Sequence, residues 1–102
     1  MVETAKALGN KGEALGIMGK NDEEIACYEA AIEKYGHSSE PGLMAQTARA
    51  IIKKGFALGK MKKKEEAIEC YEVVIDRYGQ SNEPALMRVV ARATWFLELW
   101  KR

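Results

Sequence analysis

The sequence predicts an all-α protein built as a stack of antiparallel helix hairpins, and three observations support this prediction. Short segments recur at a constant spacing, so that Tyr35-Gly36 returns 43 positions later as Tyr78-Gly79. Between these segments, apolar residues recur three or four positions apart and never alternate. Pro41 and Pro84 mark the restart of each cycle. A repeat of this length is typical of stacked supersecondary units, and five helices are expected.

The first hairpin is expected to join a helix over about residues 3 to 19 to a second helix that begins at Asn21. The apolar stripe of the first helix carries Ala5, Leu8, Gly12, Leu15 and Met18. Asn21 and Glu24 have the spacing of a capping box, which predicts reciprocal hydrogen bonds at the start of the second helix. Gly36 is expected to end that helix in the left-handed conformation.

The second hairpin repeats this plan from Ser39-Glu40-Pro41 onward, and Lys60 to Lys64 lie in the turn between its two helices. Its apolar stripes carry Met44, Ala48, Ile51, Gly55 and Leu58 in the first helix and Ile68, Tyr71, Ile75 and Tyr78 in the second. Gly12 and Gly55 each cost about 1 kcal/mol relative to alanine inside a helix. We expect close approach of Tyr28 and Tyr71 to offset this cost.

A last helix is expected from near Pro84 to the end of the sequence. One stripe is fully apolar and is expected to pack back on the second hairpin: Leu86, Val90, Ala93, Leu97 and Trp100. The stripe that would face a further partner helix contains Thr94 and Glu98, so no such partner is expected. The sequence therefore predicts one domain, 1–102, with repeats at about 1–40 and 41–83 and a capping half-repeat at about 84–102.

Composition argues against several classes of function. The formal net charge is +1, with 16 Lys and Arg against 15 Asp and Glu, so no overall field favours nucleic acid or an anionic membrane. The lysines around the turn at 60–64 are interpreted as a solvated helix end. No apolar run approaches the roughly 18 to 20 residues that span a bilayer, and we expect a cytoplasmic protein. The two cysteines occupy equivalent positions in successive repeats, so reduced, packed thiols are expected.

Catalytic and metal chemistry find little support in the sequence. The only histidine, His37, lies in an inter-repeat loop and is replaced by Gln80 in the next copy. No spacing of Cys and His suits zinc. The acidic residues at 22–24 and 65–66 begin helices, where they complement the helix dipole. We therefore expect no enzymatic activity, no metal and no cofactor.

The residues at the repeat positions resemble those of tetratricopeptide repeats, and the resemblance covers nearly the whole chain. They are Ala7, Gly12, Leu15, Ile25, Tyr28, Ala31 and Ile32, and then Ala50, Gly55, Leu58, Ala67, Ile68, Tyr71 and Ile75. The spacing exceeds the family period of about thirty-four residues, and the closing proline is replaced by Tyr-Gly-x-Ser-x-Glu-Pro, which looks like a long-period class of about forty-two residues. The resemblance implies a right-handed superhelix whose first helices line a concave face that binds a peptide or helix of another protein.

The family's groove positions map onto three successive first helices of this chain. They are Lys6, Gly9, Asn10 and Glu13, then Arg49, Ile52, Lys53 and Phe56, then Arg92, Trp95, Phe96 and Leu99. The family's clamp for a terminal carboxylate is not expected, because Glu13 and Phe56 replace its second asparagine. A protein or peptide partner is the main hypothesis. The alternative is self-association, by stacking of the repeat edges or exchange of the last helix between copies.

Overall fold

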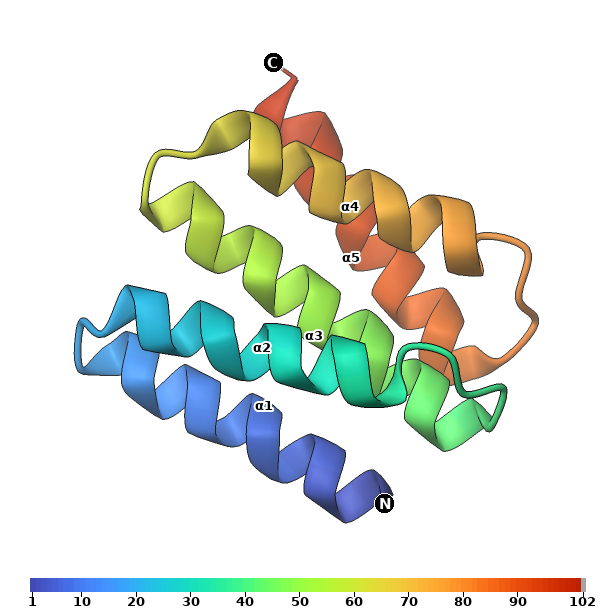
Figure 1. Ribbon diagram of the computed structural model, residues 1–102. Coiled ribbons are helices and arrows are strands. Elements are labelled where there is room, and N and C mark those ends of the chain that lie inside the picture. Colours follow the sequence, from blue (N-terminus) through green and yellow to red (C-terminus); the bar gives the residue numbers. More distant parts are fainter. Residues whose placement is uncertain (102) are drawn as a thin grey trace.

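The computed structural model describes residues 1–101, which form five α-helices and no strand (Figure 1). The helices are α1 (Val2–Ile17), α2 (Asn21–Tyr35), α3 (Pro41–Lys60), α4 (Lys64–Tyr78) and α5 (Pro84–Trp100). The pairs α1/α2 and α3/α4 are antiparallel hairpins, and α5 packs on the second of them. This arrangement confirms the predicted all-α stack of hairpins. None of the described helices is long and apolar enough to cross a membrane.

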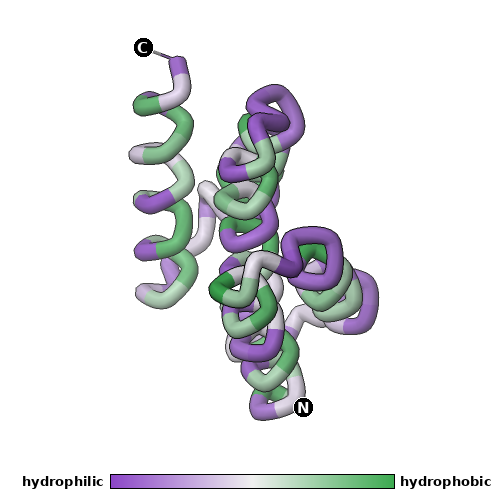
Figure 2. Tube along the Cα trace, turned by 90° about the vertical axis from the view of Figure 1, so that its left-hand side faces the viewer, coloured by the Kyte–Doolittle hydropathy of each residue, from purple (hydrophilic) through white to green (hydrophobic). Residues whose placement is uncertain are grey.

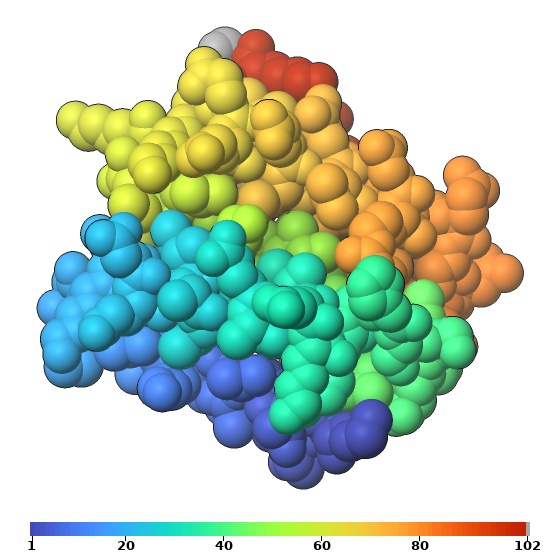
Figure 3. Space-filling view, in the orientation of Figure 1, coloured from blue at the N-terminus to red at the C-terminus, as the bar shows by residue number. Residues whose placement is uncertain are grey.

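The helices form two layers, with α3 at the centre of the molecule. Helix α3 contacts all four other helices, whereas α5 contacts only α3 and α4. The view in Figure 2 shows α5 at one end of the stack, with no helix beyond its outer side. In the shared orientation of Figures 1 and 3, α2 and α4 lie in front, and the middle of α3 is visible in the seam between them.

The two inter-repeat loops fold alike because their sequences are alike. The Ser38 hydroxyl accepts a hydrogen bond of 3.1 Å from the backbone N–H of Glu40, and Ser81 does the same for Glu83. Glu40 and Glu83 are extended and precede a proline in the first turn of a helix, where a proline costs no hydrogen bond. The same local chemistry therefore starts α3 and α5.

The core is largest where α3, α4 and α5 meet and continues between α2 and α3. Tyr28 and Tyr71 are 1% and 0% exposed, as predicted for equivalent core positions. A Cβ at Gly12 would collide with the Tyr28 ring, and one at Gly55 would lie 2.8 Å from Cε1 of Tyr71. The glycines therefore allow each tyrosine ring to lie directly against the neighbouring backbone, which confirms the predicted close approach.

Three local expectations are wrong, each for a physical reason. Asn21 and Glu24 form no capping box, because Asn21 is already helical and the Glu24 side chain is buried elsewhere. Gly36 has a right-handed φ of −64°, and glycine is needed there because a Cβ would collide with the Ile32 carbonyl. Met18 lies beyond the end of α1 and is 63% exposed, so it adds nothing to the stripe.

Candidate functional site

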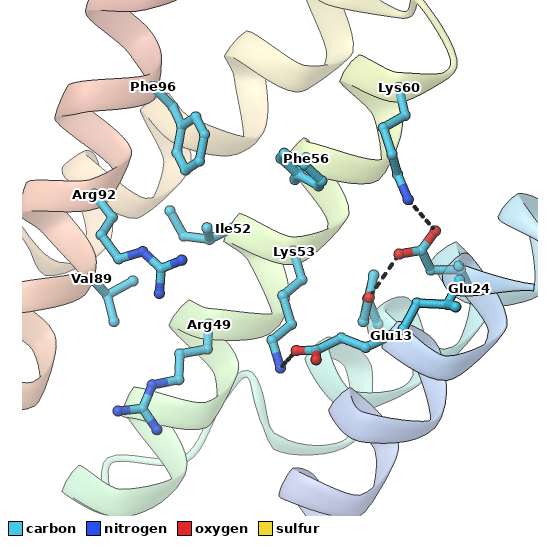
Figure 4. A pocket seen from close by; sticks show the side chains of 13 residues that line it. Glu13, Glu24, Arg49, Ile52, Lys53, Phe56, Lys60, Val89, Arg92 and Phe96 are labelled. Atoms are coloured by element: carbon cyan, nitrogen blue, oxygen red, sulfur yellow. Dashed lines mark hydrogen bonds and ion pairs between the residues drawn. The ribbon is translucent and has the colours of Figure 1, made fainter.

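A groove with a volume of about 430 Å³ lies between α1 and α5, with α3 as its floor (Figure 4). Five residues of α3 point into it at intervals of three or four positions, which places them on one helical face. They are Arg49, Ile52, Lys53, Phe56 and Lys60. The walls come from Glu13, Gly16 and Ile17 of α1, Glu24 and Tyr28 of α2, and Val89, Arg92 and Phe96 of α5.

One end of the groove is aromatic. Phe56 is 50% exposed, and its ring centroid lies 6.1 Å from that of Phe96, at a tilt of 59°. Phe96 is held in place because its ring stacks on the buried Tyr71 at 5.2 Å. A second cavity of about 250 Å³, lined by both phenylalanines, Leu99 and Trp100, adjoins this end. The result is a partly exposed apolar surface on a rigid base.

The cations of the groove fall into two groups. Lys53 forms an ion pair of 2.5 Å with Glu13, and Lys60 one of 3.4 Å with Glu24. Arg49 and Arg92 form no ion pair with any residue between 1 and 101. Figure 4 shows the Arg49 guanidinium at the end of the groove away from Phe56 and the Arg92 guanidinium beside Ile52, between Phe96 and Arg49. The uncompensated positive charge therefore extends from the middle of the groove to the end away from Phe56.

Glu24 joins the first hairpin to the second. Its side chain is buried, accepts a hydrogen bond of 2.9 Å from the Tyr28 hydroxyl and pairs with Lys60 of the next repeat. Burial, followed by the hydrogen bond to Glu24, raises the pKa of Tyr28. The equivalent position in the second repeat is Ala67. The space near Gly59 that matches the Glu24 carboxylate is filled by the Trp100 indole instead.

The structure brings together seven of the twelve groove positions named in the sequence, and Gly9 and Leu99 are among the five outside the cavity lining. Glu13, Arg49, Ile52, Lys53, Phe56, Arg92 and Phe96 line the cavity. Lys6 and Asn10 are exposed on α1 outside its lining. Trp95 is also outside it, because its ring packs edge-on against Phe96 from the outer side of α5 and is 60% exposed.

Sequence reasoning missed six lining residues: Gly16, Ile17, Glu24, Tyr28, Lys60 and Val89. The available signal was the mismatch between repeats, because Glu24 aligns with Ala67 and Lys60 with Ile17. A charged residue that replaces alanine on an otherwise apolar stripe requires a partner in the core. Glu24 and Lys60 are each other's partners.

The remaining reactive groups do not gather at the groove. Cys27 and Cys70 are free and buried, as expected, and burial raises the pKa of the Cys70 thiol. Over the part of the chain that the structure describes, no three His, Cys, Asp or Glu residues are placed to hold a metal ion. A third cavity, of about 550 Å³ on the opposite face, is lined by charges of both signs around the Lys54–Glu29 ion pair.

Two family models match the sequence, and both are described as the tetratricopeptide repeat. One covers residues 5–33 and the other residues 46–81, so that each falls on one hairpin and together they span more than half of the chain. The chain belongs to the tetratricopeptide repeat family. Searches of curated proteins and of solved structures gave no match.

Tetratricopeptide repeats generally mediate interactions between proteins. In this chain the two matched repeats lie on α1/α2 and α3/α4, and α5 lies outside both matches. The groove is lined chiefly by α1, α3 and α5. It is therefore built chiefly from the first helix of each matched hairpin and from α5.

Proposed function

We propose that this tetratricopeptide repeat protein is an interaction scaffold that binds a segment of a partner protein in the groove between α1, α3 and α5. The bound segment carries an acidic side chain and an apolar anchor. One observation carries this proposal. The groove contains two arginines that have no ion-pair partner in residues 1–101, and it also contains an exposed aromatic surface apart from them.

Charge complementarity supports an acidic ligand. Lys53 and Lys60 are compensated by Glu13 and Glu24, so a ligand gains little from them. Arg49 and Arg92 come from two different helices and lie close enough to line the same cavity. A carboxylate between two guanidinium groups can accept several charge-assisted hydrogen bonds, and the arginines would orient the ligand more than they would increase its affinity.

The spacing of the groove residues supports a specific order of ligand side chains. Arg49 and Phe56 are two turns apart on α3, which corresponds to about 10 Å along the helix axis. A peptide in the extended polyproline II conformation rises about 3.1 Å per residue and returns to the same face every three residues, so side chains three positions apart cover this distance and point the same way. The proposed ligand is therefore an extended segment in which an aspartate or glutamate stands three residues from a phenylalanine or leucine.

A peptide array with defined spacings tests the proposal. Each peptide would carry one aspartate at position i and one phenylalanine at a position from i+1 to i+6 in an otherwise Ala/Ser sequence. We expect the strongest binding at a spacing of three and loss of binding for Arg49→Glu and Arg92→Glu. Glu72→Arg on the exposed side of α4 and Lys11→Glu on α1 serve as controls that change charge outside the groove.

Two outcomes would contradict the proposal. Equal binding of the peptides with all six spacings would show that the two ends of the groove do not bind the same ligand at once. Undiminished binding by both arginine variants would place the acidic side chain elsewhere. We propose no catalytic role for this scaffold. Its cytoplasmic location and its membership of the long-period class remain predictions.

A further inference from the structure

Helix α5 presents three different faces, and only two of them have a partner. One face packs on α3 and α4 through Leu86, Ala93 and their neighbours, and a second lines the groove through Val89, Arg92 and Phe96. The third is exposed along its whole length. Its residues recur three or four positions apart, as one helical face requires: Met87, Arg88, Ala91, Thr94, Trp95 and Glu98.

This outer face carries large apolar side chains along its length and one charged side chain near each end. Met87, Trp95 and Leu99 are 54%, 60% and 47% exposed, which is a high density of large apolar groups for one exposed helix. Arg88 and Glu98 lie at opposite ends of the face, and neither forms an ion pair within residues 1–101. The face therefore carries opposite charges on either side of Trp95, with Met87 and Leu99 just beyond them.

The residues of the face are arranged nearly symmetrically about Ala93, with Thr94 as the exception, because its counterpart is the groove residue Arg92. Arg88 and Glu98 stand five positions before and after it, Ala91 and Trp95 two positions, and Met87 and Leu99 six positions. In two antiparallel helices related by a two-fold axis at this level, each residue faces its symmetry counterpart in the other copy. Each pair is complementary: arginine meets glutamate, a small residue meets a large one, and two apolar side chains meet.

We propose that two copies of this chain form a symmetric dimer through the outer faces of their α5 helices, packed antiparallel about a two-fold axis at Ala93. The Trp95 ring of each copy lies over Ala91 of the other, and Arg88 of each copy pairs with Glu98 of the other. A second copy fits this face because the face is complementary to itself. The groove stays open at Val89 and Phe96, which belong to its lining and not to the outer face.

The size of the face sets the strength of the dimer. Helix α5 is about 25 Å long, and a pair of such helices buries less than the 1,200 Å² or more of a standard stable interface. The dimer is therefore weak and depends on concentration. Its charged ends also make it sensitive to salt.

A set of single and double charge reversals tests this interface. The mass of each variant would be measured by sedimentation equilibrium at several protein concentrations and at low ionic strength. We expect the wild type to approach the dimer mass and Arg88→Glu and Glu98→Arg each to lower the association constant at least about tenfold, because each places like charges at both ends of the interface. The Arg88→Glu, Glu98→Arg double variant should recover association, and Trp95→Ala should lose it.

Matched controls separate this interface from a general effect of charge. Lys11→Glu and Glu72→Arg change the net charge equally at exposed positions on other helices, α1 and α4, and should associate like the wild type. Circular dichroism would verify that every variant keeps its helices. A wild type that stays monomeric at all concentrations, single reversals that dimerise normally, or a double variant that stays monomeric would each overturn the proposal.

Discussion

The hydroxyl of Tyr28 donates a hydrogen bond of 2.9 Å to a carboxylate oxygen of Glu24, and the equivalent hydroxyl of Tyr71 has no such acceptor. Position 67, which matches Glu24, is alanine, and the Tyr71 hydroxyl is buried without a hydrogen-bond partner among the described residues. Two side chains in equivalent places therefore contribute differently to stability. One anchors a buried carboxylate, and the other carries a cost of desolvation.

Replacing each tyrosine by phenylalanine should expose this difference. Tyr28→Phe removes a hydrogen bond to a buried carboxylate and should lower the free energy of unfolding by about 1.5 to 3 kcal/mol. Tyr71→Phe removes only an unsatisfied hydroxyl and should change it by less than about 0.5 kcal/mol, or increase it. Urea denaturation of the two variants measures both values, and equal losses would show that the Glu24 bond contributes nothing.

Alkaline pH should destabilise the protein through its buried tyrosines. Burial raises the pKa of Tyr28, Tyr71 and Tyr78 above about 10, so the folded chain keeps phenolic protons that the unfolded chain loses. This stability is fully present below pH of about 10 and falls above it, by up to about 1.4 kcal/mol per pH unit for each tyrosine. Denaturation midpoints measured between neutral and strongly alkaline pH would show the fall.

Tyr71→Phe is the control for this pH effect, because it removes one titrating group from a site whose hydroxyl has no partner among the described residues. The variant should lose stability less steeply above pH of about 10 than the wild type. An unchanged slope would mean that Tyr71 titrates normally in the folded chain and that its environment is wetter than the structure indicates.

The hairpin stack could be predicted because its signals are repeated and local. Apolar spacing, Pro41 and Pro84, and the Gly12–Tyr28 and Gly55–Tyr71 pairs each occur twice in the same register. Helix ends were harder to predict, because they depend on non-local contacts. Glu24 has the sequence spacing of a capping residue, but the ion pair with Lys60, 36 positions away, holds it in the core.

The turns inside the two hairpins provide a further test, because their backbone is alike and their sequence is not. Gly19 has a φ of +79°, and the equivalent residue, Lys62, has a φ of +64°. The left-handed region costs a non-glycine residue about 1 kcal/mol. Lys62→Gly should therefore raise the thermal midpoint, and Gly19→Lys should lower it. A lower midpoint for Lys62→Gly would show that the lysine side chain contributes more than its backbone strain costs.

The groove could be predicted only in part, and the limit is geometric. Matching positions between repeats identified Arg49, Phe56 and Arg92, because each first helix turns the same face to the groove. The same rule placed Lys6, Asn10 and Trp95 there, but these side chains lie outside the cavity lining. The packing of α5 on α3 and α4 turns Trp95 outward, and repeat spacing alone does not fix that rotation.

Phe56 is the residue on which the proposed peptide affinity depends most. It is half exposed, sits on the groove floor and packs against Phe96, which itself stacks on buried Tyr71. An aromatic side chain fixed on a rigid base loses little entropy when a ligand covers it, and such residues dominate binding energy. Phe56→Ala should therefore weaken the Asp/Phe peptide with a spacing of three by more than about 1 kcal/mol, as measured by calorimetry.

The free protein should tolerate this change, because the ring of Phe56 lies at the surface. Helicity and the denaturation midpoint of Phe56→Ala are expected to stay close to those of the wild type. Val73→Ala removes another exposed apolar side chain, on α4 and outside the groove, and should leave peptide binding unchanged. If Phe56→Ala bound the peptide normally while Trp95→Ala did not, the apolar anchor would lie on the outer face of α5, and the groove would lose its proposed role.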